Sequence, residues 1–356
     1  MRLDDMALLL PQWPVFGLGD DARPALRAAL STGHPAALAT IVGLSGGGPR
    51  PIGTQMVLAA NVLSGFLSGG CLEADVAGHA HEVLAGGAPK RLVYGEGSPW
   101  PDIRLLCGAR IEIQLERIEP GDAASGRLFA VSDARVAALW VSDGIRRVCE
   151  PAERAFAAWP GAYAKVFEPV PRLIVLGSDP TALAIATLAA QAGFDTTLVR
   201  PKGPVEPPPI AGIAYSRDAP DAALDAIGLD RWTAVAVATH DAELDHAALV
   251  AALPSSAFYV GALGARRRVE DRRTWLKAAG VAEDRIDRLH APIGLDIGGK
   301  APWEVAIAVL AQITALRYDR ASGSTSTGSP ADTAAAPRSR LTNALASEKI
   351  RTIDES

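Results

Sequence analysis

Residues 172–177, Arg-Leu-Ile-Val-Leu-Gly, form a short apolar run that ends in glycine. A helical pattern runs from Pro180 to Gln191, Gly193 stands just beyond its end, and residues 195–199 are the next predicted strand. A buried strand, a helix and another buried strand in this order are typical of the unit that opens a dinucleotide-binding fold. This stretch predicts a C-terminal Rossmann-like domain with a parallel sheet.

The nucleotide fingerprint that usually accompanies this unit is incomplete. Gly177-Ser178-Asp179 stands where the pattern has glycine, any residue and glycine, and Ala182 takes the third glycine position. Asp179 would place a negative charge against a pyrophosphate. Arg200 occupies the position of the acidic residue that binds a ribose hydroxyl, so the site suits either a 2′-phosphate or no nucleotide. NAD(P) binding is therefore weakly supported.

Further strands and loops follow along the chain. Apolar runs at residues 233–238 and 257–260 predict two more strands, separated by a helix over residues 243–252. Because ligands bind beyond the carboxyl ends of parallel strands, the residues after these runs are candidate site residues. They are His240, Asp241, Gly264 and Arg266. The alternatives are a capping or loop histidine and, for the arginines at 266–268, a solvated helix face.

The N-terminal half contains two glycine-rich loops, residues 45–53 and 64–73, each preceded by a strand-like run. Their amide groups and Arg50 suit an oxyanion such as phosphate, and we expect both loops to open onto one pocket. A helical stripe begins at Leu72, which places Cys71 in the first turn, where a helix lowers a thiol pKa. The alternative is a tight turn beside a small buried cysteine.

The two other cysteines differ in context. Cys107 precedes residues 111–118, whose alternating pattern predicts a half-buried strand, so its thiol is a second candidate for the pocket. The alternative is a structural cysteine. Cys149 lies in a predicted hairpin and is interpreted as structural.

The predicted organisation is an α/β chain with four parts. Residues 1–120 form a mixed α/β domain and residues 121–169 a hairpin-containing connecting segment. Residues 170–318 form the Rossmann-like domain, which ends in a helix over 303–318. Residues 319–356 are rich in Ser, Thr, Ala, Gly and Pro and are predicted to be disordered.

Composition excludes several classes of protein. The 356 residues include 35 Lys and Arg against 40 Asp and Glu, a net charge of −5, which argues against a general nucleic-acid binder. Three widely separated cysteines form neither a disulfide framework nor a zinc motif and indicate a reducing compartment. With no signal sequence and no apolar run of about 20 residues, a cytoplasmic protein without a membrane span is expected.

Three blocks of sequence resemble the XdhC/CoxI family, the accessory proteins of xanthine dehydrogenase and carbon monoxide dehydrogenase maturation. The blocks are residues 45–53 with 68–73, residues 237–241, and residues 261–267 with the run Leu-His-Ala-Pro-Ile-Gly-Leu-Asp-Ile-Gly at 289–298. The resemblance spans roughly residues 24–317 and keeps the order of the blocks.

This resemblance implies a function. Family members bind the molybdenum cofactor, shield it during terminal sulfuration and deliver it to a molybdenum hydroxylase. They work with a cysteine desulfurase and the apo-enzyme, commonly dimerise, and are chaperones rather than turnover enzymes. The residues that carry the resemblance and the loops above give the candidate cofactor contacts, with the thiolates as candidate molybdenum ligands. They are Ser45, Arg50, Gly53, Ser68, Gly69, Gly70, Cys71, Glu73, Cys107, His240, Asp241, Gly264, Arg266, His290 and Asp296.

The chain also departs from the family pattern. Gly46 and Gly47 replace a serine and a threonine, and Ala109 replaces a second glycine after Cys107. Asp179 and Arg200 depart in the Rossmann half and weaken nicotinamide binding. The main hypothesis is a cofactor chaperone that is not an enzyme. The alternatives are an NAD(P)-dependent oxidoreductase and a silent scaffold for a desulfurase.

Overall fold

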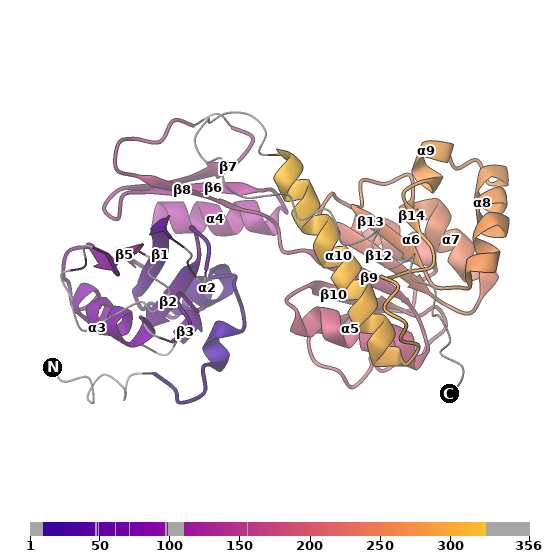
Figure 1. Cartoon of the computed structure of the whole chain (residues 1–356), viewed down its shortest axis with the longest axis horizontal. Coiled ribbons are helices and arrows are strands. Elements are labelled where there is room, and N and C mark those ends of the chain that lie inside the picture. Colours follow the sequence, from indigo (N-terminus) through magenta and orange to yellow (C-terminus); the bar gives the residue numbers. More distant parts are fainter. Residues whose placement is uncertain are drawn as a thin grey trace, which may run out of the picture.

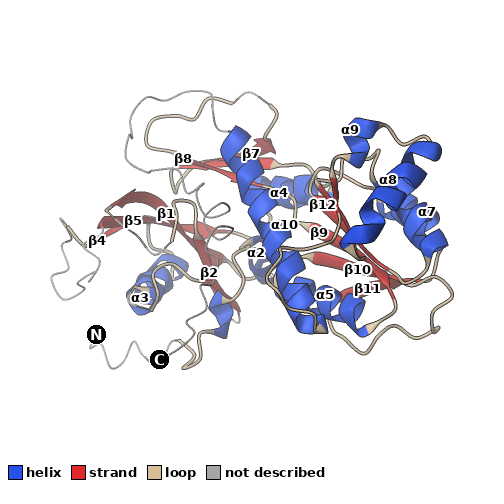
Figure 2. Cartoon of the chain, turned by 45° about the vertical axis from the view of Figure 1, so that its right-hand side comes forward, coloured by secondary structure: helices blue, strands red, loops and turns tan. Residues whose placement is uncertain are grey.

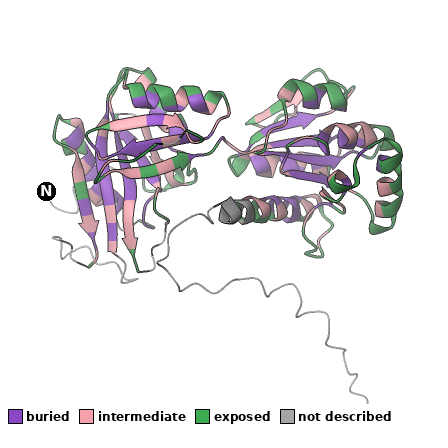
Figure 3. Cartoon of the chain, turned by 90° about the horizontal axis from the view of Figure 1, so that it is seen from above, coloured by how far each residue is buried: buried purple, intermediate pink, exposed green. Residues whose placement is uncertain are grey.

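A computed structural model of the chain describes residues 10–324 except 47, 49, 61, 71, 97, 99–109 and 155. Two parts lie side by side, with the first half of the chain on the left and the second half on the right in Figure 1. Buried positions gather in the strands of both parts, and the exposed positions gather on the outer helices and loops (Figure 3). The chain therefore has separate hydrophobic cores.

The N-terminal part is built on an antiparallel sheet, sheet A, with strand order β3-β2-β1-β5-β4. Alternate residues of β1 enter opposite cores, as the strand period requires. Ala37, Ala39 and Ile41 pack with α3, while Ala36 and Leu38 pack with α2 and α4. The strands and helices are η1 (Val15–Gly17), α2 (Arg23–Ser31), β1 (Ala36–Ser45), β2 (Gln55–Ala59), β3 (Val62–Gly65), α3 (Glu73–Leu84), β4 (Lys90–Tyr94), β5 (Arg110–Ile118) and α4 (Ala123–Asp133).

A three-stranded antiparallel sheet follows, with order β7-β6-β8. It consists of β6 (Ala138–Ser142), β7 (Arg147–Pro151) and β8 (Tyr163–Phe167). The predicted hairpin is β6–β7, whereas α4 and β8 were not predicted. Trp140 of β6 is fully buried in the same core as α2 and α4, so this sheet packs against the N-terminal part.

The C-terminal part contains a parallel sheet, sheet C, with order β11-β10-β9-β12-β13-β14. Leu173 and Val175 of β9 pack with α5 and α10, while Ile174 and Leu176 pack with α6, α7 and α8. Helices therefore cover both faces of the sheet (Figure 2). The elements are β9 (Arg172–Gly177), α5 (Pro180–Gln191), β10 (Asp195–Val199), β11 (Ile213–Ser216), α6 (Pro220–Ile227), β12 (Thr233–Ala238), α7 (Ala242–Ala252), β13 (Tyr259–Ala262), η2 (Arg266–Arg268), α8 (Val269–Ala278), α9 (Glu283–Ile286), β14 (Leu289–His290) and α10 (Pro302–Ser324).

The predicted fold class, a mixed α/β part followed by a Rossmann-like parallel sheet, is confirmed. The bounds of β9, α5, β10 and β12 agree with those predicted from the sequence. Other boundaries differ: β13 spans Tyr259–Ala262 where 257–260 was predicted, α3 begins at Glu73 rather than Leu72, and β5, α7 and α10 each begin one residue earlier than predicted. The helix α10 also continues to Ser324, where the predicted helix ended at 318. The rest of the predicted disordered tail, 325–356, lies outside the described residues.

Candidate functional site

Three loops start and end at one end of sheet A, here called the loop end. The register pairs Ser45 with Arg110 and Tyr94 with Ile111, and it pairs Met56 with Gly65. Because neighbouring strands are antiparallel, the β1–β2, β3–α3 and β4–β5 connections all leave the sheet at this end. The two glycine-rich loops therefore leave the sheet at the same end, and the shared pocket onto which they are expected to open stays a prediction. The β4–β5 connection carries Cys107.

The second glycine-rich loop is organised around Glu73, whose carboxylate is almost fully buried. It accepts hydrogen bonds from the amides of Leu67, Ser68, Gly70 and Leu72 at 2.7–3.3 Å, and from the hydroxyl of Ser68 at 2.8 Å. Gly69 and Gly70 have φ of +106° and +104°, which only glycine adopts at low cost. The amides expected to receive an external anion are thus largely used by the chain's own carboxylate.

Arg50 of the first glycine-rich loop forms an ion pair with Asp20. The pair is accessible, because the Asp20 side chain is 69% exposed and that of Arg50 is 30% exposed. The Nε atom of Arg50 is buried and finds no acceptor among the described residues.

Lys165 of β8 forms hydrogen bonds to the end of the first glycine-rich loop. Its ammonium group donates to the carbonyl of Gly53 at 2.6 Å and to the side-chain oxygen of Gln55 at 3.0 Å. Burial lowers the pKa of Lys165 to about 8. The side-chain amide of Gln55 donates a hydrogen bond to the hydroxyl of Thr40 at 3.1 Å. These hydrogen bonds connect the loop to the interior of sheet A.

A buried polar network extends this connection. Thr40 contacts the hydroxyl of Tyr163 at 3.2 Å, and Tyr163 donates to Glu116, which is fully buried. Glu116 also accepts hydrogen bonds from Ser142 and Arg147 at 2.7 and 3.0 Å. The network links the three-stranded sheet to the loop end.

The N-terminal segment touches both glycine-rich loops. Asp20 reaches Arg50 of the first loop, and the ring of Phe16 lies 6.2 Å from the ring of Phe66 at the start of the second. A Cβ atom on Gly17 would stand 2.9 Å from the Cβ of Phe66, so this approach requires glycine. The segment of residues 16–20 therefore packs against both glycine-rich loops at the loop end.

Cys71 and Cys107, the predicted molybdenum ligands, lie outside the described residues. Both residues that flank Cys71 are described, and the amides of Gly70 and Leu72 donate to Glu73. Among the described residues no group of three or more His, Cys, Asp or Glu side chains has the arrangement of a metal site. Cys149 is buried, and burial raises the pKa of its thiol to about 11, which agrees with a structural role.

The predicted site residues of the second half lie at the carboxyl edge of sheet C. Most of their side chains contact other groups of the protein itself. Asp179 caps α5 by accepting from the amide of Ala182 at 2.8 Å, and its second oxygen lies 3.0 Å from Nε2 of His240. Burial opposes ionisation of Asp179, yet these hydrogen bonds outweigh it and lower the pKa. Asp241 caps α7 through the amides of Glu243 and Leu244.

A pocket of about 430 Å³ lies beside His240 at this edge and is bordered by Gly264 and Arg268. One wall is a buried pair in which Arg272 donates to Asp245 at 3.1 Å. Asp245 also accepts a hydrogen bond from Thr239 at 2.6 Å. Burial outweighs these contacts and raises the pKa of Asp245.

The 289–298 run is anchored to the same edge. Arg266 pairs with Asp296 at 2.5 Å, both side chains being about three-quarters exposed. His290 stacks on Tyr259 with ring centroids 4.8 Å apart, and burial lowers the His290 pKa. Arg266, Asp296 and His290 thus fasten the run to β13 and η2.

Sequence reasoning missed Asp20, Phe16 and Lys165. Lys165 had a usable signal, because Tyr163, Lys165 and Phe167 alternate along β8 toward the interior. A lysine on an inward face needs polar partners. Asp20 and Phe16 lie in a short irregular segment without periodicity, so no local pattern indicated them.

Two family models match the chain, one in each half. The model described as XdhC Rossmann domain matches residues 173–313, and the one described as XdhC and CoxI family matches residues 29–95. No helix among the described residues is long and apolar enough to cross a membrane.

Two curated relatives and one solved structure are similar over most of their length. The molybdenum cofactor insertion chaperone PaoD of Escherichia coli is 31% identical over 84% of this chain and 90% of its own. A probable xanthine dehydrogenase subunit of Bacillus subtilis is 24% identical over 82% and 96%. A crystal structure of a xanthine dehydrogenase from Bacillus halodurans superposes with a TM-score of 0.69 at 23% identity, covering 87% of this chain and 98% of that one. That last likeness shows the fold. The chain belongs to the XdhC and CoxI family.

Proposed function

We propose that this chain binds the molybdenum cofactor, shields it during sulfuration and delivers it to an apo molybdenum hydroxylase of the xanthine dehydrogenase type. Its similarity to a molybdenum cofactor insertion chaperone supports the broader role of an accessory chaperone. The observation that carries the proposal is that three loops leave sheet A at the loop end and that one of them carries Arg50, whose side chain is partly exposed.

Arg50 is the proposed phosphate ligand. Its guanidinium is partly exposed and pairs with Asp20, whose side chain is mostly exposed. An exposed ion pair contributes little stability, about 0–1 kcal/mol, so a doubly charged phosphate with several acceptor oxygens can displace the aspartate. Ser45, at the end of β1, and Gly53, held by Lys165, border the same loop.

Cys71 and Cys107 are the proposed sulfur contacts of the molybdenum, because thiolates are soft ligands. Glu73 supports this role as a positioning residue. It fixes the amides of Gly70 and Leu72, on either side of Cys71, together with Ser68. A buried carboxylate with five hydrogen bonds holds the backbone on both sides of the thiol.

The Rossmann-like part gives the oxidoreductase alternative no support at its first strand-to-helix turn. Asp179 caps α5 and faces His240 where a dinucleotide would place its pyrophosphate. His240, Asp241, Gly264, Arg266, His290 and Asp296 remain proposed contacts to the cofactor or the client. We further propose a cysteine desulfurase as sulfur donor, a homodimeric assembly and a cytoplasmic location.

The proposal is tested by incubating the purified chain with cofactor and measuring molybdenum and pterin fluorescence after gel filtration. We expect near-stoichiometric retention by the wild type and its loss in Cys71→Ala. A parallel titration with NADPH should change neither fluorescence nor melting temperature. Retention by neither protein, or a melting shift with NADPH, would contradict the proposal.

A further inference from the structure

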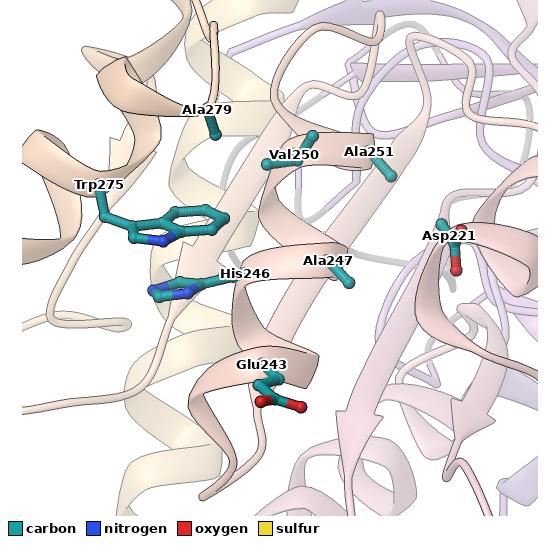
Figure 4. A pocket seen from close by; sticks show the side chains of 8 residues that line it. All are labelled: Asp221, Glu243, His246, Ala247, Val250, Ala251, Trp275 and Ala279. Atoms are coloured by element: carbon teal, nitrogen blue, oxygen red, sulfur yellow. The ribbon is translucent and has the colours of Figure 1, made fainter.

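A groove of about 610 Å³ lies over the outer face of α7, between α6 and α8. Its floor is formed by Ala247, Val250 and Ala251 of α7, whose small side chains leave the helix surface open (Figure 4). One wall carries Trp275 of α8 stacked on His246, with ring centroids 3.4 Å apart and planes at 11°. The groove is therefore apolar and has an aromatic wall.

The borders of the groove carry two carboxylates. Asp221 of α6 and Glu243 of α7 stand at its borders, both exposed. No ion pair to either carboxylate occurs in the described part of the chain, and no lysine or arginine of that part lines the groove. An occupant with apolar side chains flanked by cations would satisfy both the floor and the borders.

The chain contains such a segment at residues 338–351, Arg-Ser-Arg-Leu-Thr-Asn-Ala-Leu-Ala-Ser-Glu-Lys-Ile-Arg. It holds four cations and one acid, a balance of +3 in a chain whose net charge is −5. At helical spacing one face carries two leucines with a cation at each end. These residues are Arg338, Leu341, Leu345 and Lys349.

We propose that residues 338–351 dock in this groove of the same chain, as a helix laid in a groove. Leu341 and Leu345 cover the alanine floor, and the flanking cations pair with Asp221 and Glu243. Residues 325–337 separate the segment from the end of α10 and span up to about 45 Å when extended. A tether of this length gives a millimolar effective concentration, so even a weak contact is populated. This docking does not depend on the proposed cofactor function.

The test uses a fluorescein-labelled synthetic peptide of residues 336–352 and the chain truncated after Ser324, where the described fold ends. We expect saturable anisotropy changes that Ala251→Trp, which fills the floor, weakens by about tenfold or more. Asp221→Lys with Glu243→Lys should weaken binding similarly without altering the floor. Ala226→Trp, on an exposed position of α6 outside the groove lining, is the matched control and should leave binding unchanged.

The full-length chain gives the decisive comparison. Because its own segment competes, it should bind the labelled peptide about tenfold or more weakly than the truncated chain. A peptide with Leu341→Glu and Leu345→Glu should bind neither protein. Absence of binding to the truncated chain, or equal binding with Ala251→Trp, would overturn the docking site. Equal binding by full-length and truncated chains would overturn occupation by the chain's own segment.

Discussion

The loop end of sheet A and the carboxyl edge of sheet C are both places where the sequence predicts ligand contacts. At both places the predicted groups bind carboxylates of the protein itself. At the carboxyl edge, Asp179 is fixed by the amide of Ala182 and by His240. At the loop end, Glu73 is fixed in the same way, but Asp20 reaches Arg50 from the surface. The two regions thus differ in whether an external anion can displace the protein's own carboxylate from its partner.

This difference separates structural carboxylates from replaceable ones. Asp179 and Glu73 satisfy backbone amides that would otherwise lack partners, so losing either costs stability. Asp20 satisfies a side chain in an exposed pair, where water and salt already compete. An anionic ligand therefore meets less resistance at Arg50 than at the first turn of the Rossmann-like part.

The largest expected effect follows from Glu73→Ala. It removes the acceptor of four amides and one hydroxyl in a buried loop, and we expect the free energy of unfolding to fall by about 3–5 kcal/mol. Urea denaturation measures this, with the exposed Glu153→Ala as control. Unchanged midpoints for both variants would refute the structural role of Glu73.

A smaller effect concerns Lys165 and is visible as a pH dependence. Its folded-state pKa of about 8 lies below the ordinary value of 10.5 because burial penalises the ammonium form. Between these values the unfolded chain binds the proton more strongly, so the wild type gains stability relative to Lys165→Met as pH rises. The gain is at most about 1.4 kcal/mol per pH unit.

Urea denaturation of both proteins at pH 7 to 9.5 checks this prediction. The difference between them should stay constant below about pH 8 and change above it. A constant difference over the whole range would show that Lys165 titrates as an ordinary exposed lysine.

Asp179→Ala sharpens the comparison at the carboxyl edge. Loss of the α5 cap should lower the free energy of unfolding by about 1 kcal/mol. Because Asp179 is assigned a structural role, cofactor retention should match the wild type after gel filtration at a temperature where both are folded. Loss of retention in this folded variant would contradict the structural role of Asp179 and show that cofactor binding depends on the carboxyl edge of sheet C.

The smallest effect on stability is expected for Asp20→Asn, below about 1 kcal/mol. The variant should nevertheless bind inorganic pyrophosphate several-fold more tightly than the wild type, because the competing carboxylate is gone. Isothermal titration measures this, and Asp133→Asn, which frees Arg27 in a comparable exposed pair, is the control. Equal affinities in all three proteins would remove Arg50 as the anion ligand.

The sequence predicted much of the fold because its strands and helices are strongly patterned. The strands β9, β10 and β12 and the helix α5 have the bounds that the sequence predicts. It also placed both glycine-rich loops correctly. The use of the second loop's amides by Glu73 was not predictable, because Glu73 had no periodic signal that distinguished a buried acceptor from a solvent-facing cofactor contact. Likewise, the Asp20–Arg50 pair was not predictable, because its residues are 30 positions apart and Asp20 lies in a segment without periodicity.

The most direct test of the account is the molybdenum retained per chain after loading and gel filtration, compared between the two regions. We predict that Arg50→Ala and Cys71→Ala lose the cofactor. Arg268→Ala, at the carboxyl-edge pocket, and Arg27→Ala, in the exposed pair with Asp133, should retain it at the wild-type level. Retention by Arg50→Ala and Cys71→Ala together with loss in Arg268→Ala would contradict the account and assign the cofactor to the Rossmann-like part.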